Sequence, residues 1–314
     1  MKKKRAEYFY GPVYSRRLGF SLGVDLLQKK ICSYGCVYCQ QGATAHTTLQ
    51  RFNCVDITEL KKQLNVILAQ KPHIDYITVS GSGEPTLHQG LDKLLKAIND
   101  VTKHKYSICV ITNGSLLSDA KVRQELRGAD MVMPSLDGYD EKSFQMIDKP
   151  DKHLSFAQTV AGLVDFRKEY QGELWLEIML VKGINDTQKA FLRFKELVAM
   201  IKPDKVQINL PVRPAPHTKK NLMPAMKAVN SFHKILGAVS AVVVAKPVKS
   251  KKHFLDDCTQ IVTTTLKRRP QTIDDLANGL QIDYPSLKRC LSILLKTGKI
   301  NENKKGDKTY FVFA

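Results

Sequence analysis

The stretch Cys32-Ser-Tyr-Gly-Cys36-Val-Tyr-Cys39 places three cysteines within eight residues. It comes shortly after residues 21–26, whose alternating pattern predicts a first β-strand. Thiolates are soft ligands that select zinc, copper(I) or iron–sulfur clusters. A closed zinc site needs four ligands, and the sequence has no second cysteine pair at a useful spacing. Three ligands on one tight loop suit a four-iron cluster whose remaining iron is open to a small chelating cosubstrate.

Strand-like and helix-like segments alternate from about residue 20 to residue 240. Six strand-then-helix units predict an α/β fold with a parallel sheet and external helices. Right-handed crossovers then favour an open or partial barrel, because six units are too few for the eightfold one. The expected strands are 21–26, 74–80, 106–112, 131–135, 174–181 and 205–209, and the expected helices are 56–70, 90–103, 119–127, 155–170, 188–201 and 224–236.

A change in composition divides the chain into two expected domains. The stretch Ala245-Lys-Pro-Val-Lys-Ser-Lys-Lys252 indicates a basic linker over residues 245–254, between a core of residues 1–244 and a small domain of residues 255–314. The small domain is expected to hold three helices and a β-hairpin, at 256–269, from Thr272 onward, at 284–297 and around the turn 304–307. This succession resembles a winged helix–turn–helix domain.

Further short motifs follow the ends of the predicted strands. In chain order they are Gly81-Ser-Gly-Glu-Pro85, Ile111-Thr-Asn-Gly114, Ser135-Leu-Asp-Gly138 and Val181-Lys-Gly-Ile-Asn185. Parallel βα folds build their sites at the C-terminal ends of the strands. Together with the cysteine loop and its aromatic Tyr38, these motifs resemble the signature of the radical S-adenosylmethionine (SAM) superfamily.

The resemblance implies a partial (β/α)6 barrel of the radical SAM type, with a [4Fe–4S] cluster held by Cys32, Cys36 and Cys39. SAM would chelate the open iron, and a one-electron donor such as a flavodoxin or ferredoxin would reduce the cluster. The cleaved SAM would give a 5′-deoxyadenosyl radical that abstracts hydrogen from a substrate. The cofactor contacts that the resemblance implies are Tyr38, Gly81, Gly83, Glu84, Asn113, Ser135, Asp137 and Ile184.

Among these contacts, Glu84 is expected to accept a hydrogen bond from the SAM ammonium, since a carboxylate suits that charge. Gly81 and Gly83 let the backbone approach closely, and Tyr38 is expected to contact adenine. Candidate substrate groups lie at the start of the chain and on the later strands; they are Arg16, Arg17, Glu177, Gln207, Asn209 and Arg213. Core hydrogen bonding and plain salt bridges are the alternative roles for these six side chains.

The opening segment, residues 11–25, is similar to the radical SAM enzymes of wyosine base formation in tRNA. Those enzymes carry further cysteines upstream for a second cluster, whereas this chain has none before Cys32. The similarity therefore does not extend to wyosine synthesis itself.

The formal charge of +19 and the pI of about 9.5 direct attention to an acidic partner. Nucleic acid, with tRNA as the example, is the first candidate, and simple solubility is the alternative. In the small domain the third helix would offer Lys288, Arg289 and Lys296, and the hairpin would offer Lys304, Lys305 and Lys308. A lid, a docking module or a dimer contact is the other interpretation of this domain.

Three functions remain open from the sequence. They are radical chemistry on a nucleic acid, radical chemistry on a small metabolite or peptide, and a cluster-bearing regulator that binds nucleic acid without turnover. No apolar run approaches the roughly 20 residues of a membrane span. The basic start is not followed by an apolar stretch, so a cytoplasmic protein without a targeting segment is expected.

The seven cysteines are expected to be thiols in a reducing compartment and not a disulfide framework. Cys258 and Cys290 are expected to serve small apolar packing. The sequence leaves the oligomeric state open.

Overall fold

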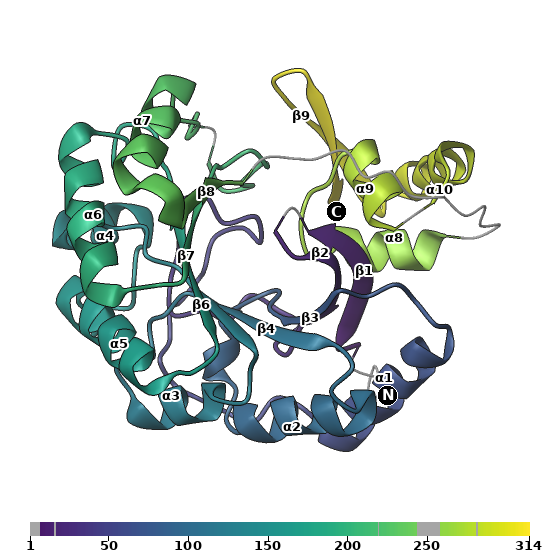
Figure 1. Cartoon of the computed structure of the whole chain (residues 1–314). Coiled ribbons are helices and arrows are strands. Elements are labelled where there is room, and N and C mark those ends of the chain that lie inside the picture. Colours follow the sequence, from purple (N-terminus) through teal and green to yellow (C-terminus); the bar gives the residue numbers. More distant parts are fainter. Residues whose placement is uncertain (1–6, 16, 219, 244–257, 281) are drawn as a thin grey trace.

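The computed structural model describes residues 7–15, 17–218, 220–243, 258–280 and 282–314. Its centre is an eight-stranded sheet whose strands lie side by side in chain order and form an open arc (Figure 1). β1 is antiparallel to β2, and each later neighbouring pair is parallel. The strands are β1 (Phe9–Ser15), β2 (Gly19–Val24), β3 (Tyr76–Val79), β4 (Ser107–Thr112), β5 (Met131–Pro134), β6 (Glu173–Met179), β7 (Lys205–Asn209) and β8 (Ser240–Val242).

The helices of the larger domain cover the outer face of this arc (Figure 1). They are α1 (Ile57–Ala69), α2 (Leu91–Thr102), α3 (Ala120–Leu126), α4 (Glu141–Ile147), α5 (Phe156–Glu169), α6 (Gln188–Ile201) and α7 (Met226–Leu236). Five of them begin at a side chain that accepts a hydrogen bond from a first-turn N–H group, which fixes where each helix starts; these caps are Asp56, Asp119, Asp140, Ser155 and Thr187. In the described part of the chain, no helix is both long and apolar enough to cross a bilayer.

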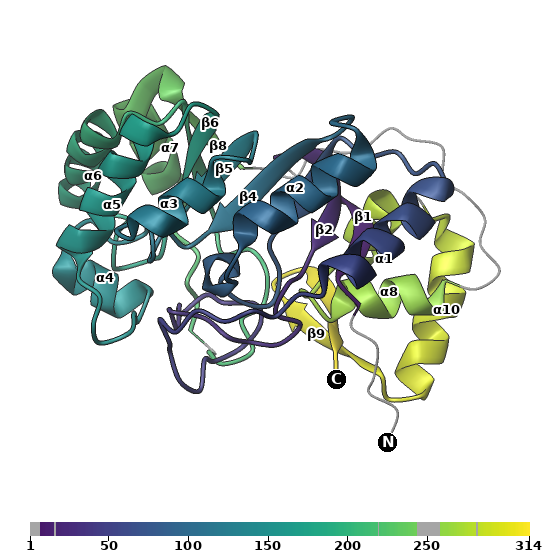
Figure 2. The same ribbon diagram turned by 90° about the horizontal axis from the view of Figure 1, so that it is seen from below.

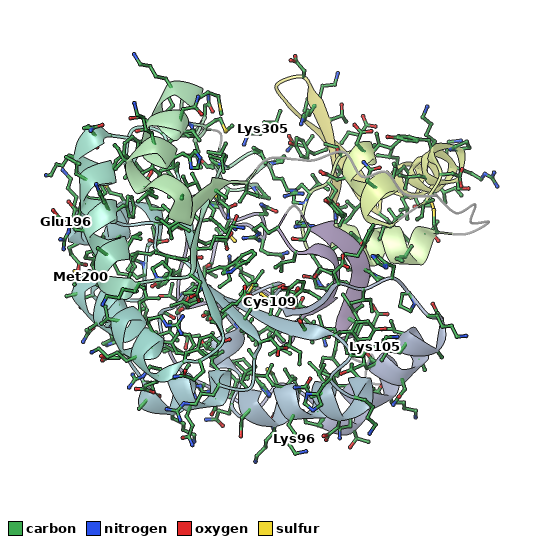
Figure 3. The ribbon with its side chains drawn as sticks, in the orientation of Figure 1. Lys96, Lys105, Cys109, Glu196, Met200 and Lys305 are labelled. Carbon is green, nitrogen blue, oxygen red and sulfur yellow. A yellow bond between two sulfur atoms is a disulfide. The ribbon has the colours of Figure 1, made fainter. Side chains whose placement is uncertain are left out.

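Each central strand is buried on both faces. Along β4, Ile108 and Val110 belong to the large core shared with the outer helices, whereas Cys109 between them belongs to a separate cluster with Met131 and Met133. Successive side chains on a strand point to opposite faces. The second cluster therefore fills the inside of the arc, where Figure 3 shows Cys109. Apolar packing on both faces is typical of a parallel sheet with covered surfaces.

The predicted partial (β/α)6 barrel is confirmed, since all six expected strand-then-helix units are present. Two strands and one α-helix of this domain were not predicted. β1 contains the cis-bonded pair Gly11 and Pro12, and its register shifts between Tyr10 and Val13, which hides its alternation. β8 spans only three residues, and α4 is a seven-residue helix. These short or irregular elements add to the six units without changing their order.

The smaller unit has three helices and a hairpin in the predicted order, with a core of its own. Its elements are α8 (Thr259–Leu266), α9 (Ile273–Gly279), α10 (Tyr284–Lys296), β9 (Ile300–Lys305) and β10 (Lys308–Phe313). The expected linker lies in residues 244–257, outside the described residues. Cys258 and Cys290 are buried in the small core, as predicted, but the expectation of free thiols is wrong for them, because their sulfurs form a disulfide.

The small unit packs beside the open side of the arc, where α8 and α9 lie against β1. Its hairpin also contacts the segment after β7. The Lys305 Nζ donates to the carbonyl oxygens of Pro211 and Arg213 at 2.7 and 3.0 Å, and the Tyr310 hydroxyl donates to the Val212 carbonyl at 2.9 Å. Figure 1 shows the hairpin on this side of the barrel. The expectation that Lys305 is offered to nucleic acid from the hairpin is therefore wrong, because its ammonium group binds the main chain of the barrel.

A buried ion pair joins the segment before α1 to α3. The Arg51 guanidinium and the Glu125 carboxylate are 11% and 7% exposed, and Arg51 also donates to the carbonyls of Thr86 and His88 at 2.8 and 2.9 Å. We expect Arg51→Ala to lower the free energy of unfolding by about 3–5 kcal/mol, because it leaves a buried carboxylate unpaired.

Chemical denaturation monitored by circular dichroism measures this change. Arg193→Ala is the control, because the Arg193–Glu196 pair is 43% and 63% exposed and should contribute less than about 1 kcal/mol. Equal effects of the two substitutions would contradict the role assigned to the buried pair.

Candidate functional site

The cysteine loop leaves the C-terminal end of β2 and is held by main-chain hydrogen bonds to the end of α4. The Gly35 N–H donates to the Asp148 carbonyl, and the Val37 N–H donates to the Ile147 carbonyl, both at 2.9 Å. Figure 2 shows the purple segment after β2 extending from one side of the sheet. The loop therefore has a defined path although it contains neither helix nor strand.

The thiols of Cys32, Cys36 and Cys39 are free and half-buried. Lys30 interacts electrostatically with all three, and its Nζ lies 2.5 Å from the Cys39 sulfur. Burial lowers the pKa of Lys30, but the cysteines outweigh burial and its pKa is raised. Burial also raises the pKa of Cys32 to about 11 and holds that of Cys36 well above its usual range. Metal binding at these thiols must therefore release protons.

The chemistry of the donor set, three free thiols on one loop, fits an iron–sulfur cluster. Within the described residues, no three His, Cys, Asp or Glu side chains converge closely enough to hold one metal ion. A four-iron cluster binds each thiolate to a different iron, so its ligands need not meet at one point. Three free thiols on one loop, each electrostatically coupled to Lys30, fit that requirement.

Glu84 is a buried carboxylate, 2% exposed, at the end of β3. Its Oε1 accepts hydrogen bonds from the Thr86 N–H at 3.0 Å and from the hydroxyls of Thr86 and Thr112 at 2.6 Å. Its Oε2 accepts from the Asn113 N–H at 2.7 Å. Burial raises the pKa of Glu84, while these hydrogen bonds lower it without cancelling the rise. Asn113 also donates from Nδ2 toward the Cys32 sulfur at 3.5 Å, so it links the carboxylate to the cysteine loop.

The two glycines of the motif are required by the protein's own packing. A Cβ on Gly81, whose φ is +132°, would lie 2.6 Å from the Asp25 Cγ. A Cβ on Gly83 would lie 1.9 Å from the Ile31 carbonyl oxygen. The close approach at both glycines is thus to β2 and to the cysteine loop, and a contact of either with a cofactor stays a prediction.

Four of the predicted cofactor contacts, Tyr38, Asp137, Ser135 and Ile184, lie near one another. Tyr38 and Ile184 belong to one small apolar cluster. The Tyr38 hydroxyl donates to the Asp137 carboxylate, which also accepts from the Met179 N–H at 2.7 Å. Burial raises the pKa of Asp137 to about 6. Ser135 lies nearby at the end of β5, where its N–H donates to the Thr112 carbonyl.

Three of the candidate substrate residues also form one group. Arg17 and Asn209 both donate to the Glu177 carboxylate, although Arg17 precedes β2 and the other two lie on β6 and β7. Gln207 is buried on β7. Arg213 lies apart from this group, 3.6 Å from Asp275 of the small unit.

The remaining candidate, Arg16, is outside the described residues. Sequence reasoning missed Asp25, Gln41 and Arg268, which connect the site to the small unit. The Arg268 Nε lies 2.8 Å from the Asp25 Oδ2, and the Gln41 side chain donates to the Arg268 carbonyl. Asp25 directly follows β2, the position at which the other motifs lie, and this was the one signal available for it.

Comparisons with known proteins agree with this site. A family model described as "Radical SAM superfamily" matches residues 29–194, and the chain belongs to this superfamily. It is 38% identical over 208 residues to a UPF0026 protein of Synechocystis, covering 66% of this chain and 76% of that one. The chain is thus a radical SAM enzyme, with SAM and a [4Fe–4S] cluster as its cofactors.

Other matches limit which properties of similar proteins can be assigned to this chain. A protein of Brachyspira hyodysenteriae named "GTPase Obg" is 35% identical over 96% of this chain, but the chain spans only 44% of its length. The crystal structure of a radical SAM methyltransferase from Sphaerobacter thermophilus has a TM-score of 0.52 at 17% identity, covering 71% of this chain and 65% of that one, which supports the fold alone. A tRNA 4-demethylwyosine synthase of Methanocaldococcus jannaschii is 30% identical over 39% of this chain and 35% of its own length.

We expect Cys36→Ala to abolish the visible absorbance of the reconstituted cluster and all SAM cleavage, because one iron loses its thiolate. Cys54→Ala is the matched control, since Cys54 is also a free, half-buried thiol but lies against His88, with 3.3 Å between its sulfur and the ring Nδ1. A normal spectrum in Cys36→Ala would refute the ligand assignment.

We expect Glu84→Gln to keep the cluster absorbance and to weaken SAM binding about tenfold or more. Hydrogen bonds to charged groups contribute about 1.5–3 kcal/mol, and the substitution removes the negative charge that the ammonium would meet. Anaerobic equilibrium dialysis with labelled SAM measures the affinity. Glu196→Gln on the outer helix α6, labelled in Figure 3, removes the same charge and should leave binding unchanged. Wild-type affinity in Glu84→Gln would remove Glu84 from the SAM site.

Proposed function

We propose that this enzyme abstracts a hydrogen atom from a nucleic-acid substrate, with tRNA as the first candidate. The chemistry is supported by one observation above all: three free thiols lie on one loop, and Asn113 donates hydrogen bonds both to the buried Glu84 and to the Cys32 sulfur of that loop. When bound, the cluster supplies one electron that cleaves SAM, and the resulting 5′-deoxyadenosyl radical removes the hydrogen. A flavodoxin or ferredoxin in the cytoplasm is the proposed electron donor.

The chain's own residues bind and orient the cofactors in this proposal. Cys32, Cys36 and Cys39 would hold the cluster through their thiolates. Glu84 would accept a hydrogen bond from the SAM ammonium, since its Oε2 accepts one hydrogen bond within the described protein and can accept a second. Tyr38 and Ile184 supply an apolar surface for adenine, with the Tyr38 ring fixed by its bond to Asp137.

Buried apolar side chains fill part of the barrel interior and keep water out of it. Leu18, Cys109, Met131 and Met133 form a buried cluster inside the arc of strands. The Arg17–Glu177 pair and Asn209 lie in the same interior. A reactive radical needs such a dry surrounding to avoid side reactions. A substrate then approaches from the C-terminal ends of the strands, where the motifs lie.

A basic surface on α10 supports a nucleic-acid substrate. Lys288, Arg289 and Lys296 are exposed on this helix, which packs against α8, α9 and β9 and leaves these side chains at the surface. Cations on one exposed helix face are what phosphate binding requires. A tRNA-acting relative with partial similarity is consistent with this substrate class.

A small metabolite or peptide is the second candidate, and the docked hairpin favours it. A cavity of about 1050 Å³ lies between the two units, lined by residues of both, among them Arg213, Lys304, Lys308 and Tyr310. The hairpin lysines that a winged helix would present to nucleic acid here face this cavity or, for Lys305, bind the main chain. The same docking disfavours a regulator that uses the hairpin as a free wing.

We expect bulk tRNA to stimulate release of 5′-deoxyadenosine from SAM and dithionite by the anaerobically reconstituted enzyme. The double variant Lys288→Glu, Lys296→Glu should lose this stimulation and bind tRNA at least tenfold more weakly at low salt, because two phosphate-binding cations become anions. Release without added tRNA should be unchanged in that variant.

Lys195→Glu on the outer face of α6 is the control, because it makes the same kind of charge change at a site away from α10. If tRNA does not change the release of 5′-deoxyadenosine, the result would favour a metabolite or peptide as the substrate. No release from a fully loaded cluster would favour the non-catalytic regulator.

A further inference from the structure

The small unit reaches the SAM-motif side of the barrel through one buried ion pair. Arg268, just after α8, places its Nε 2.8 Å from the Oδ2 of Asp25, just after β2. The two side chains are 9% and 1% exposed. Burying a carboxylate this deeply is unfavourable without compensating partners, and here one of them is a cation from another part of the fold.

Asp25 in turn holds the glycine motif. Its Oδ2 accepts from the Ser82 hydroxyl at 2.6 Å, and its Oδ1 accepts from the Ser82 N–H at 3.2 Å. Gly81 packs so closely on Asp25 that a Cβ would lie 2.6 Å from the carboxyl carbon. A shift of Asp25 must therefore move residues 81 and 82, which lie three and two positions before Glu84.

The same arginine segment contacts two more parts of the site. The Arg268 guanidinium lies 5.4 Å from the ring centre of Tyr10, whose hydroxyl is 3.1 Å from the Ser80 hydroxyl at the end of β3. The Arg268 carbonyl accepts a hydrogen bond from Gln41, two residues after Cys39. One short segment of the small unit thus contacts both the end of β3 and the cysteine loop.

We propose that Arg268 is a positioning residue for SAM, which acts through Asp25 to fix residues 81–84. Docking of the small unit and SAM binding then stabilise each other, since coupling between two sites is reciprocal. The inference rests on the proposed SAM site and adds that the small unit completes that site, whatever substrate the enzyme takes.

The test measures SAM affinity of the cluster-loaded, full-length protein by anaerobic equilibrium dialysis. Arg268→Ala is expected to weaken SAM binding about tenfold or more, within the usual range of coupling between sites, and to keep the cluster absorbance. Arg268→Lys restores the charge but not the fork-shaped guanidinium and should recover part of the affinity. Arg269→Ala is the matched control, because this neighbouring arginine makes no ion pair or hydrogen bond with the described residues, and it should bind SAM as the wild type does.

Hydrogen exchange supplies a readout that a purely structural role would not change. SAM should slow amide exchange in α8 of the wild type and should have much less effect in Arg268→Ala. If Arg268→Ala does not fold, the double variant Asp25→Asn, Arg268→Gln avoids the unpaired buried carboxylate and should also bind SAM more weakly.

Two results would overturn the inference: wild-type SAM affinity in a folded Arg268 variant, or α8 exchange that SAM does not change in the wild-type protein. A wild-type protein that loads its cluster and does not bind SAM would instead contradict the proposed function.

Discussion

Glu84 joins the C-terminal ends of three neighbouring strands of the sheet, β2, β3 and β4. It accepts hydrogen bonds from Thr86, Thr112 and Asn113, and the Glu84 N–H donates to the Ile31 carbonyl at 3.0 Å. Three segments, after β2, β3 and β4, therefore meet at one residue. Burial of this charge is unfavourable, and the hydrogen bonds that offset it also fix the geometry. The site is thus preorganised by the same bonds that make its buried charge tolerable.

This constraint explains the residue types around it. Gly83 has no room for a side chain against Ile31, and Gly81 has none against Asp25. Asn113 is needed both for its N–H to Glu84 and for its side chain toward Cys32 and Ser33. The residues of these motifs are therefore required in part by contacts within the protein and not only by a cofactor. A substitution there would change cofactor binding and local structure together, which is why charge-matched controls are required.

The sequence predicts local elements and misses contacts between distant ones. The six βα units follow from periodicity, and the meeting of Cys32 with Asn113 follows because parallel strands end at one edge. The Arg268–Asp25 pair links residues far apart in the chain, and neither residue carries a periodic signal. Its charge and its place in the hairpin make Lys305 a candidate for nucleic-acid binding, whereas the fold uses it to bind the carbonyls after β7. Charge composition does not distinguish these two uses.

The high net charge therefore overstates the surface available to an acidic partner. Arg17, Arg51, Arg213 and Arg268 are paired with carboxylates inside the structure, and their charge is balanced locally. What decides nucleic-acid affinity is the number of cations that can reach phosphates at once, because each contact releases counterions. On the small unit the exposed cations include Lys288, Arg289 and Lys296 of α10 and Lys304 and Lys308 of the hairpin, whereas Lys305 is occupied by the carbonyls after β7. The substrate class thus depends on which exposed cations can reach phosphates together and not on the charge of the whole chain.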